Sequence, residues 1–163
     1  MMDADRRKTF DKMFSPGSLA IIGISRTSGG LGGQFFLKNL QRAGFPGRIY
    51  LIHPAAREIS GMPTYPNISA LPEAVDLIIV CVPASVVLSV LEECSRKGVR
   101  NVHILSSGFK ELGTPEGKRL EEEVQFAGMP VAIVRNGIGQ LNEAHWHEIH
   151  KHHPSQADVE APE

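Results

Sequence analysis

The residues of this chain that are best suited to bind an anion lie in one stretch near the N-terminus. An apolar run at 19–22 ends at Gly23, and residues 25–30 are small or carry hydroxyls, apart from a fixed positive charge on Arg26. A strand, turn and helix of this kind direct free backbone N–H groups and the positive end of the helix dipole at one point, which suits a phosphate. A turn that binds nothing would use the same glycines, so the loop leaves both interpretations open. The candidate phosphate-binding residues are Gly23, Ser25, Arg26, Thr27, Gly30 and Gly32.

The same loop lacks the patterns of two common nucleotide-binding motifs. A dinucleotide fingerprint needs glycine at the first, third and sixth positions of the turn. These positions are Gly23, Ser25 and Ser28, so two of the three fail. A P-loop ends in Gly-Lys-Ser/Thr, and residues 23–33 contain no lysine. Both absences count against an NAD(P)-dependent enzyme or a P-loop nucleotidase.

Small, polar or proline-containing residues also follow the other expected strands. In an open parallel sheet, ligands bind outside the carboxyl ends of the strands, and these ends fit a groove for an elongated phosphate-bearing molecule better than a catalytic centre. His53 stands where a dinucleotide enzyme needs an acidic residue for the ribose, and His53 or Arg57 could instead meet a phosphate. The further candidate site residues are His53, Pro54, Arg57, Val82, Pro83, Ser107, Gly108 and Asn136.

The reactive side chains suggest no catalytic centre and no metal site. Cys81 lies in an apolar run and Cys94 on the apolar face of a helix, so we expect buried free thiols. No serine forms a Gly-x-Ser-x-Gly elbow, and we expect His103 to pack within a strand. We expect the histidines near the C-terminus to lie in a solvated tail whose metal affinity has no function; they are His145, His147, His150, His152 and His153.

Composition narrows the class of protein. The chain has 163 residues, 42% of them hydrophobic, which suits one domain with a core. Seventeen basic and eighteen acidic residues give a formal net charge of −1, so we expect no nucleic-acid-binding surface. No apolar run approaches the roughly 18 residues of a membrane span, and the polar N-terminus does not resemble a signal peptide. We therefore expect a cytoplasmic protein without membrane contact.

Apolar runs and helical stripes alternate along the chain, which predicts a Rossmann-like, doubly wound α/β fold with three layers, α/β/α. We expect a binding domain at 1–142 and a His-rich polar tail at 143–163. The expected strands are 19–22, 49–52, 62–65, 77–82, 102–105 and 131–134, with a lead-in helix at 6–14. The expected inward stripes of the first two covering helices are Leu31, Phe35, Phe36, Leu40 and Ala43, then Val86, Val87, Val90, Leu91 and Cys94.

A series of short motifs between about residues 10 and 125 resembles the CoA-binding domain of the NDP-forming acyl-CoA synthetases. This family includes the ADP-forming acetyl-CoA synthetases and, more distantly, the α subunit of succinyl-CoA synthetase. Each motif is weak alone, but their order and spacing are those of the family. The motifs are FSPGSLAIIGISRT (14–27), KNL (38–40), GFPGRIY (44–50), EISG (58–61), YP (65–66), LPEAVDL (71–77), CVPA (81–84) and SSGFKE (106–111).

The resemblance implies a site for coenzyme A along the strand ends. The loop at 23–27 would hold CoA phosphates, and His53 and Pro54 would lie near the adenosine part. Val82 and Pro83 would line the groove, while Ser107 and Gly108 would lie near the path of the pantetheine.

Three departures from the family pattern limit this expectation. The family often has Asn-Pro-Lys where this chain has 53–55, so a phosphate contact is lost unless Arg57 replaces it. The last strand keeps only Asn136 and Gly139 of the family's polar and glycine positions. The full synthetases also need a phosphohistidine domain and an ATP-grasp partner, so we expect no ligase activity from this chain alone.

The leading hypothesis is therefore a CoA- or acyl-CoA-binding module that works with a ligase partner subunit. An NAD(P)-binding oxidoreductase domain and a degenerate regulatory or interaction domain remain the alternatives. The sequence does not decide the acyl group, the partner or whether copies of the chain form a homo-oligomer.

Overall fold

Alternating strands and helices build the fold in the predicted order. A computed structural model describes residues 4–26, 32–125, 131–135 and 138–139. The helices are α1 (Ala4–Phe14), α2 (Gly33–Arg42), α3 (Ala84–Lys97), η1 (Lys110–Leu112) and α4 (Pro115–Gln125). The strands are β1 (Ser18–Ile22), β2 (Arg48–Ile52), β3 (Glu58–Ile59), β4 (Met62–Tyr65), β5 (Leu77–Val80), β6 (Val102–Leu105), β7 (Val131–Arg135) and β8 (Ile138–Gly139).

The strands form one sheet in the order β3-β4-β2-β1-β5-β6-β7-β8. The six strands from β4 to β7 run parallel, which confirms the doubly wound α/β prediction. The two-residue strands β3 and β8 pair antiparallel at the sheet edges and were not predicted. The strand predicted at 77–82 ends as β5 at Val80, two residues early, because the chain bends toward Pro83 and α3.

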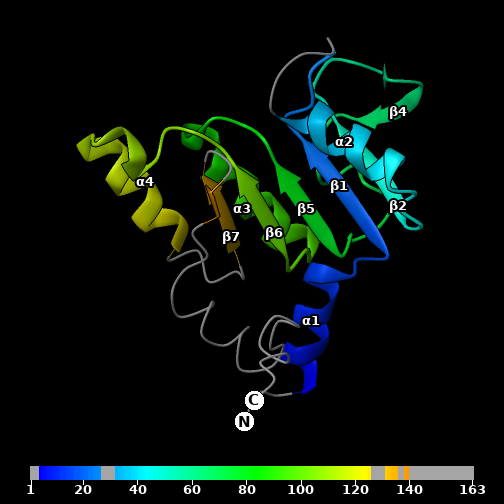
Figure 1. The fold of residues 1–163 in the computed structure, drawn as a ribbon, viewed down its shortest axis with the longest axis horizontal. Helices are drawn as coiled ribbons and strands as arrows, with labels where there is room; N and C mark the ends of the chain where they lie inside the picture. The colour runs from blue at the N-terminus through cyan, green and yellow to red at the C-terminus, as the bar shows by residue number, and fades with distance from the viewer. Residues whose placement is uncertain (1–3, 27–31, 126–130, 136–137, 140–163) are drawn as a thin grey trace, which may run out of the picture.

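Helices cover both faces of the sheet, as a parallel sheet requires. Alternate residues of each strand point to opposite faces, so β1 sends Leu19 and Ile21 into one core and Ala20 into the other. The first core includes Leu37 of α2, and the second includes Val87 of α3 together with residues of α4. In Figure 1, α2 lies over β1, whereas α4 lies beyond β7.

The two predicted helix stripes are partly wrong. In α2 the buried residues are Gly33, Gln34 and Leu37, whereas Phe35 is 49% exposed. Ala43 is also exposed. The reason is the packing of Gly33 against β1: a Cβ there would lie 2.8 Å from Ile24 Cα, so this contact fixes the rotation of α2. The side chain of Leu31 lies outside the described residues.

In α3 the first turn buries a different residue from the one predicted. Ala84 faces the core and Val86 is 42% exposed. The remaining predicted residues of this stripe are buried as expected, namely Val87, Val90, Leu91 and Cys94.

The lead-in helix α1 is held at the amino ends of the strands, below the sheet in Figure 1. Met13 is buried, and the Lys12 ammonium pairs with the Asp76 carboxylate. The same carboxylate accepts a hydrogen bond from the Gly17 backbone N–H at 2.9 Å, and the Asn101 amide donates to the Thr9 carbonyl at 3.0 Å. Burial raises the pKa of Asp76, but the bonds from Lys12 and Gly17 outweigh it, and the pKa lies below its usual 3.8.

This pKa shift predicts a loss of stability in acid. Because the folded-state pKa of Asp76 is depressed, its contribution is present above the unfolded value near 3.8 and is lost as the pH falls through the lower folded value. Asp76→Asn should therefore lower the melting temperature at pH 6 and flatten its decline between pH 5 and pH 3. Asp11→Asn, an exposed position on α1, is the control. A decline as steep in Asp76→Asn as in the parent chain would contradict the assignment.

Candidate functional site

The candidate site lies at the carboxyl edge of the sheet, where β1, β2, β5 and β6 end. The arrowheads of β1, β5 and β6 point to the same edge in Figure 1, opposite α1. Ligands of open parallel sheets bind outside this edge. The segments that leave it are the loop after β1, the turn after β2, the start of α3 and the turn between β6 and η1.

The turn after β1 touches the backbone that leaves β5. Gly23 has a φ of +85°, and a Cβ on it would lie 2.3 Å from the Cys81 carbonyl oxygen. The Cys81 N–H in turn donates to the Ile22 carbonyl at 2.8 Å. Only glycine permits this approach and this φ together. The contact therefore brings the candidate phosphate loop beside the entrance to α3.

The start of α3 is joined to the exit of β6. The Ala84 N–H donates to the Ser107 carbonyl at 3.2 Å. Gly108 has a φ of +109°, and a Cβ there would lie 3.2 Å from the Ala84 Cβ. The structure thus places the first residue of α3 next to Ser107 and Gly108.

The exit of β6 also holds a buried hydroxyl without a partner. Ser106 Oγ is shielded from solvent and makes no hydrogen bond within the part of the chain that the structure describes. A buried polar atom without a partner is costly, so this hydroxyl is a local destabilising feature of the turn after β6. The Glu111 carboxylate accepts from the N–H groups of Gly108 at 2.7 Å and Phe109 at 3.2 Å, which fixes the turn that carries Ser106.

The turn after β2 is organised by its histidine. His53 Nδ1 accepts hydrogen bonds from the backbone N–H groups of Ala55 at 3.1 Å and Ala56 at 2.8 Å. Since Nδ1 accepts both, the ring hydrogen belongs on Nε2, which leaves Nε2–H as the donor for a ligand. Pro54 and Arg57 are exposed beside it. His53 therefore serves the turn itself and keeps one donor for binding.

The structure gathers some of the candidate residues and leaves others apart. Gly23, Val82 and Pro83 share one junction, and Ser107 and Gly108 adjoin it. His53 and Pro54 follow β2, which pairs with β1 through Ile52 and Ile22. Arg57 lies farther out, where its carbonyl accepts from the Thr64 N–H at 3.0 Å. Thr27, Gly30 and Asn136 lie outside the described residues.

The helices α2 and α3 both begin near this edge, and their N-cap residues have no side chain that could accept a capping hydrogen bond. Gly32 is the N-cap of α2, and Pro83 is the N-cap of α3; neither makes a side-chain capping bond. Ser25 and Arg26 are exposed. Two helix N-termini from opposite faces of the sheet, with one guanidinium nearby, favour an anionic ligand.

Among the described residues, burial shifts the pKa values of two cysteines and one histidine close to the sheet. Burial raises the pKa of Cys81 and of Cys94 to about 12, so both thiols stay protonated and unreactive near neutrality. Both cysteines are free, as predicted, but only Cys94 is buried; Cys81 is partly buried because it follows the end of β5. Burial lowers the pKa of His103, which is half-buried in β6 as the sequence led us to expect. The cluster of C-terminal histidines lies outside the described residues.

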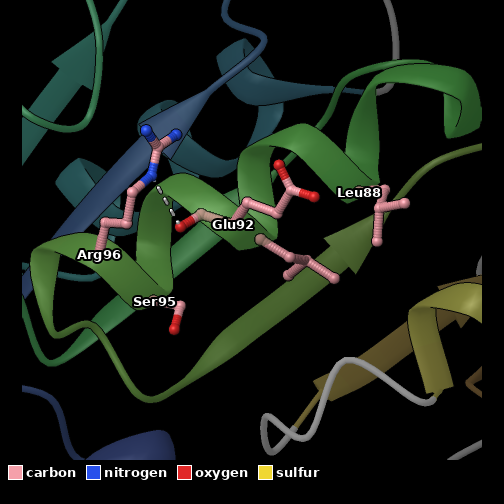
Figure 2. A pocket seen from close by; sticks show the side chains of 5 residues that line it. Leu88, Glu92, Ser95 and Arg96 are labelled. Atoms are coloured by element: carbon pink, nitrogen blue, oxygen red, sulfur yellow. Dashed lines mark hydrogen bonds between the residues drawn. The ribbon is translucent and has the colours of Figure 1, made fainter.

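A separate hollow lies along α3, away from the carboxyl edge. Its volume is about 610 Å³. Figure 2 shows the side chains of Leu88, Glu92, Ser95 and Arg96 around it, with Arg96 Nε donating to the Glu92 carbonyl at 3.4 Å. These residues belong to the later turns of α3, whereas the candidate site lies at its first turn, so the hollow is distinct from the site.

Comparison with known proteins agrees with this architecture. Residues 17–137 match the family described as "CoA binding domain". The chain belongs to this family. It is 43% identical over 114 residues to acetate–CoA ligase [ADP-forming] I of Archaeoglobus fulgidus, which covers 70% of this chain and 16% of the relative. It is 39% identical over 120 residues to the subunit alpha of acetate–CoA ligase [ADP-forming] I of Pyrococcus furiosus, covering 71% of this chain and 26% of the relative.

A solved structure also resembles this chain in its fold. A dinucleotide-forming acetyl-coenzyme A synthetase 1 from Ca. Korarchaeum cryptofilum, in complex with phosphate and ADP, superposes with a TM-score of 0.68 at 35% identity. The match covers 76% of this chain and 26% of that one. The chain thus spans between a sixth and about a quarter of the length of these relatives. The described residues contain no helix long and apolar enough to cross a membrane.

Sequence reasoning missed two residues of this edge. Ser106 was treated only as a polar strand exit, and its lone buried hydroxyl needs the coordinates to be seen. Gln34 was overlooked although a usable signal existed: it stands one position after Gly33 and three before Leu37, so a polar side chain shares the buried side of α2.

The close contact at Gly23 gives a testable prediction. Gly23→Ala would place a methyl group against the Cys81 carbonyl and hold alanine at positive φ, which by itself costs about 1–2 kcal/mol. We expect a larger loss of unfolding free energy than for Gly44→Ala, a glycine with a φ of +66° and no atom within 4 Å of its virtual Cβ. Urea denaturation measures both variants. Equal losses of unfolding free energy in the two variants would mean that the close approach of Gly23 to Cys81 does not exclude a methyl group.

Proposed function

We propose that this chain binds coenzyme A or an acyl-CoA at the carboxyl edge of its sheet. Membership of the CoA binding domain family supports the ligand class. The observation that carries the proposal is the junction at Gly23, where the loop after β1 lies against the backbone entering α3. This junction puts the Ser25–Arg26 segment and the starts of two helices on one edge.

The ligand would be held mainly through its phosphates. The exposed guanidinium of Arg26 and the uncapped N-termini of α2 and α3 supply positive potential without a lysine. His53 Nε2–H adds a donor on the β2 side. On the β6 side, the exposed Ser107 would lie along the predicted pantetheine path.

We also propose that the chemistry of acyl transfer is supplied by another polypeptide or segment. The candidate site combines backbone donors, hydroxyls and fixed charges, and the thiols in the described cores are held protonated by burial. The relatives that this chain partly spans are named as ADP-forming ligases, one of them as a subunit alpha. A CoA-presenting role beside a ligase partner fits this division.

Calorimetric titration of the purified chain with CoA tests the proposal, with NAD as the control ligand. We expect saturable binding of CoA in the micromolar range, since phosphates and a long flexible ligand are held by an open groove, and no heat from NAD. Binding of NAD alone would overturn the assignment in favour of a dinucleotide site. Binding of neither ligand would favour a domain that has lost its ligand.

Reversing the charge in the loop tests the role of Arg26. Arg26→Glu should weaken CoA binding by at least tenfold, equivalent to about 1.4 kcal/mol, because a carboxylate would then face the ligand phosphates. Arg42→Glu makes the same charge change in the last turn of α2, away from the site, and should leave the affinity within about twofold. Unchanged affinity in Arg26→Glu would remove Arg26 from the site.

A further inference from the structure

Gln34 is a buried amide in the first turn of a helix that otherwise buries apolar side chains. Its exposed fraction is 6%, and its buried neighbours on α2 are Gly33 and Leu37. A buried amide must find hydrogen-bond partners to offset its desolvation. The partners that Gln34 finds belong to two different loops at the candidate site.

The stronger contact is with the loop after β1. Gln34 Nε2 donates to the Ser25 carbonyl oxygen at 2.8 Å. Because a carbonyl only accepts, this bond also fixes which end of the amide faces the loop. The loop is thereby tied to the first turn of α2 immediately beside Arg26.

This bond sets the orientation of the peptide between Ser25 and Arg26. In a planar trans peptide the C=O of one residue and the N–H of the next point in opposite directions. Since the Ser25 C=O is turned inward to Gln34, the Arg26 N–H is turned outward. Ser25 and Arg26 are both exposed at the carboxyl edge of the sheet, which is the edge where the proposed ligand would bind.

The weaker contact is with the turn between β3 and β4. The Ser60 hydroxyl lies 3.5 Å from both Gln34 Nε2 and Gln34 Oε1, at the outer limit of hydrogen bonding. Ser60 has a φ of +53°, the one positive value among the described residues other than glycine. The hairpin of β3 and β4 is joined to the segment after β2, because the His53 N–H donates to the carbonyl of Tyr65, the last residue of β4, at 2.9 Å. Gln34 therefore stands between the loop after β1 and the segment after β2.

We propose that Gln34 is a positioning residue that holds the Ser25–Arg26 peptide with its N–H directed at an anionic group of the ligand. The choice of CoA phosphate as that group rests on the proposed function, whereas the ordering of the loop by Gln34 does not. Ser60 supports the amide from the hairpin side.

The experiment compares Gln34→Leu with Gln41→Leu, which makes the same change on the same helix. Gln41 lies in the last turn of α2, at the opposite end of the helix from Gln34, and its Nε2 donates to the Met62 sulfur at 3.6 Å. We expect Gln34→Leu to lower the NMR order parameters of the Ser25 and Arg26 amides in the ligand-free chain. We expect it to weaken CoA binding about tenfold, with a melting temperature within a few degrees of the parent chain. Gln41→Leu should change none of these.

Two arms keep this inference separate from the proposed function. Unchanged order at Ser25 and Arg26 in Gln34→Leu would overturn the inference, whether or not CoA binds. Lost order with CoA affinity unchanged within twofold would overturn the positioning role. A parent chain that does not bind CoA would defeat the proposed function, and the NMR comparison would still decide whether Gln34 orders the loop.

The hairpin contact is tested by Ser60→Gly, which removes the hydroxyl and suits the left-handed backbone. If Ser60 acts through Gln34, the double variant Gln34→Leu/Ser60→Gly should bind CoA no more weakly than Gln34→Leu alone. Additive losses in the double variant would show that Ser60 does not act through Gln34.

Discussion

The carboxyl edge of this sheet depends on one backbone-to-backbone contact. Gly23 lies so close to the Cys81 carbonyl that no side chain fits between them. The contact follows directly from the parallel pairing of β1 with β5, in which Ile22 stands opposite Val80. The chain leaves β1 and β5 at the same level of the sheet here. The two segments approach so closely that position 23 has no room for a Cβ.

In the proposed function, this arrangement would hold the ligand at helix starts and backbone donors. α2 and α3 start at the same edge and cover opposite faces of the sheet, so their positive ends converge there. The Cys94 thiol lies within one core and the Cys81 thiol packs against the other, and burial raises the pKa of both. Binding by such an edge uses backbone donors and fixed charges, which suits phosphate recognition and leaves the chemistry to other groups.

Three polar side chains stabilise the loops at this edge by hydrogen bonding to their backbone groups. Gln34 uses its amide to hold the loop after β1, and His53 uses Nδ1 to hold the turn after β2. Both side chains satisfy backbone groups that the turns would otherwise leave unpaired. Glu111 does the same for the turn after β6. The segments after β1, β2 and β6 are thus each held by a side chain that bonds to their backbone.

The sequence by itself determined the class of fold, because apolar runs of four to six residues separated by helical stripes have few other solutions. The start of α4 is a local feature of the same kind, since Thr114 Oγ1 accepts a hydrogen bond from the Gly117 N–H at 3.1 Å, three residues further along the chain. These features depend on neighbours along the chain, which a sequence shows directly.

Only the tertiary structure decided which way each helix faces and which polar groups meet. The stripe of α2 was misjudged at Phe35 because its rotation is set by Gly33 packing on Ile24, a contact between different elements. The meeting of Gln34, Ser25 and Ser60 likewise joins three segments that no sequence period connects. Such contacts depend on strand order and crossover geometry, so the residues that shape the site emerge only when the sheet is assembled.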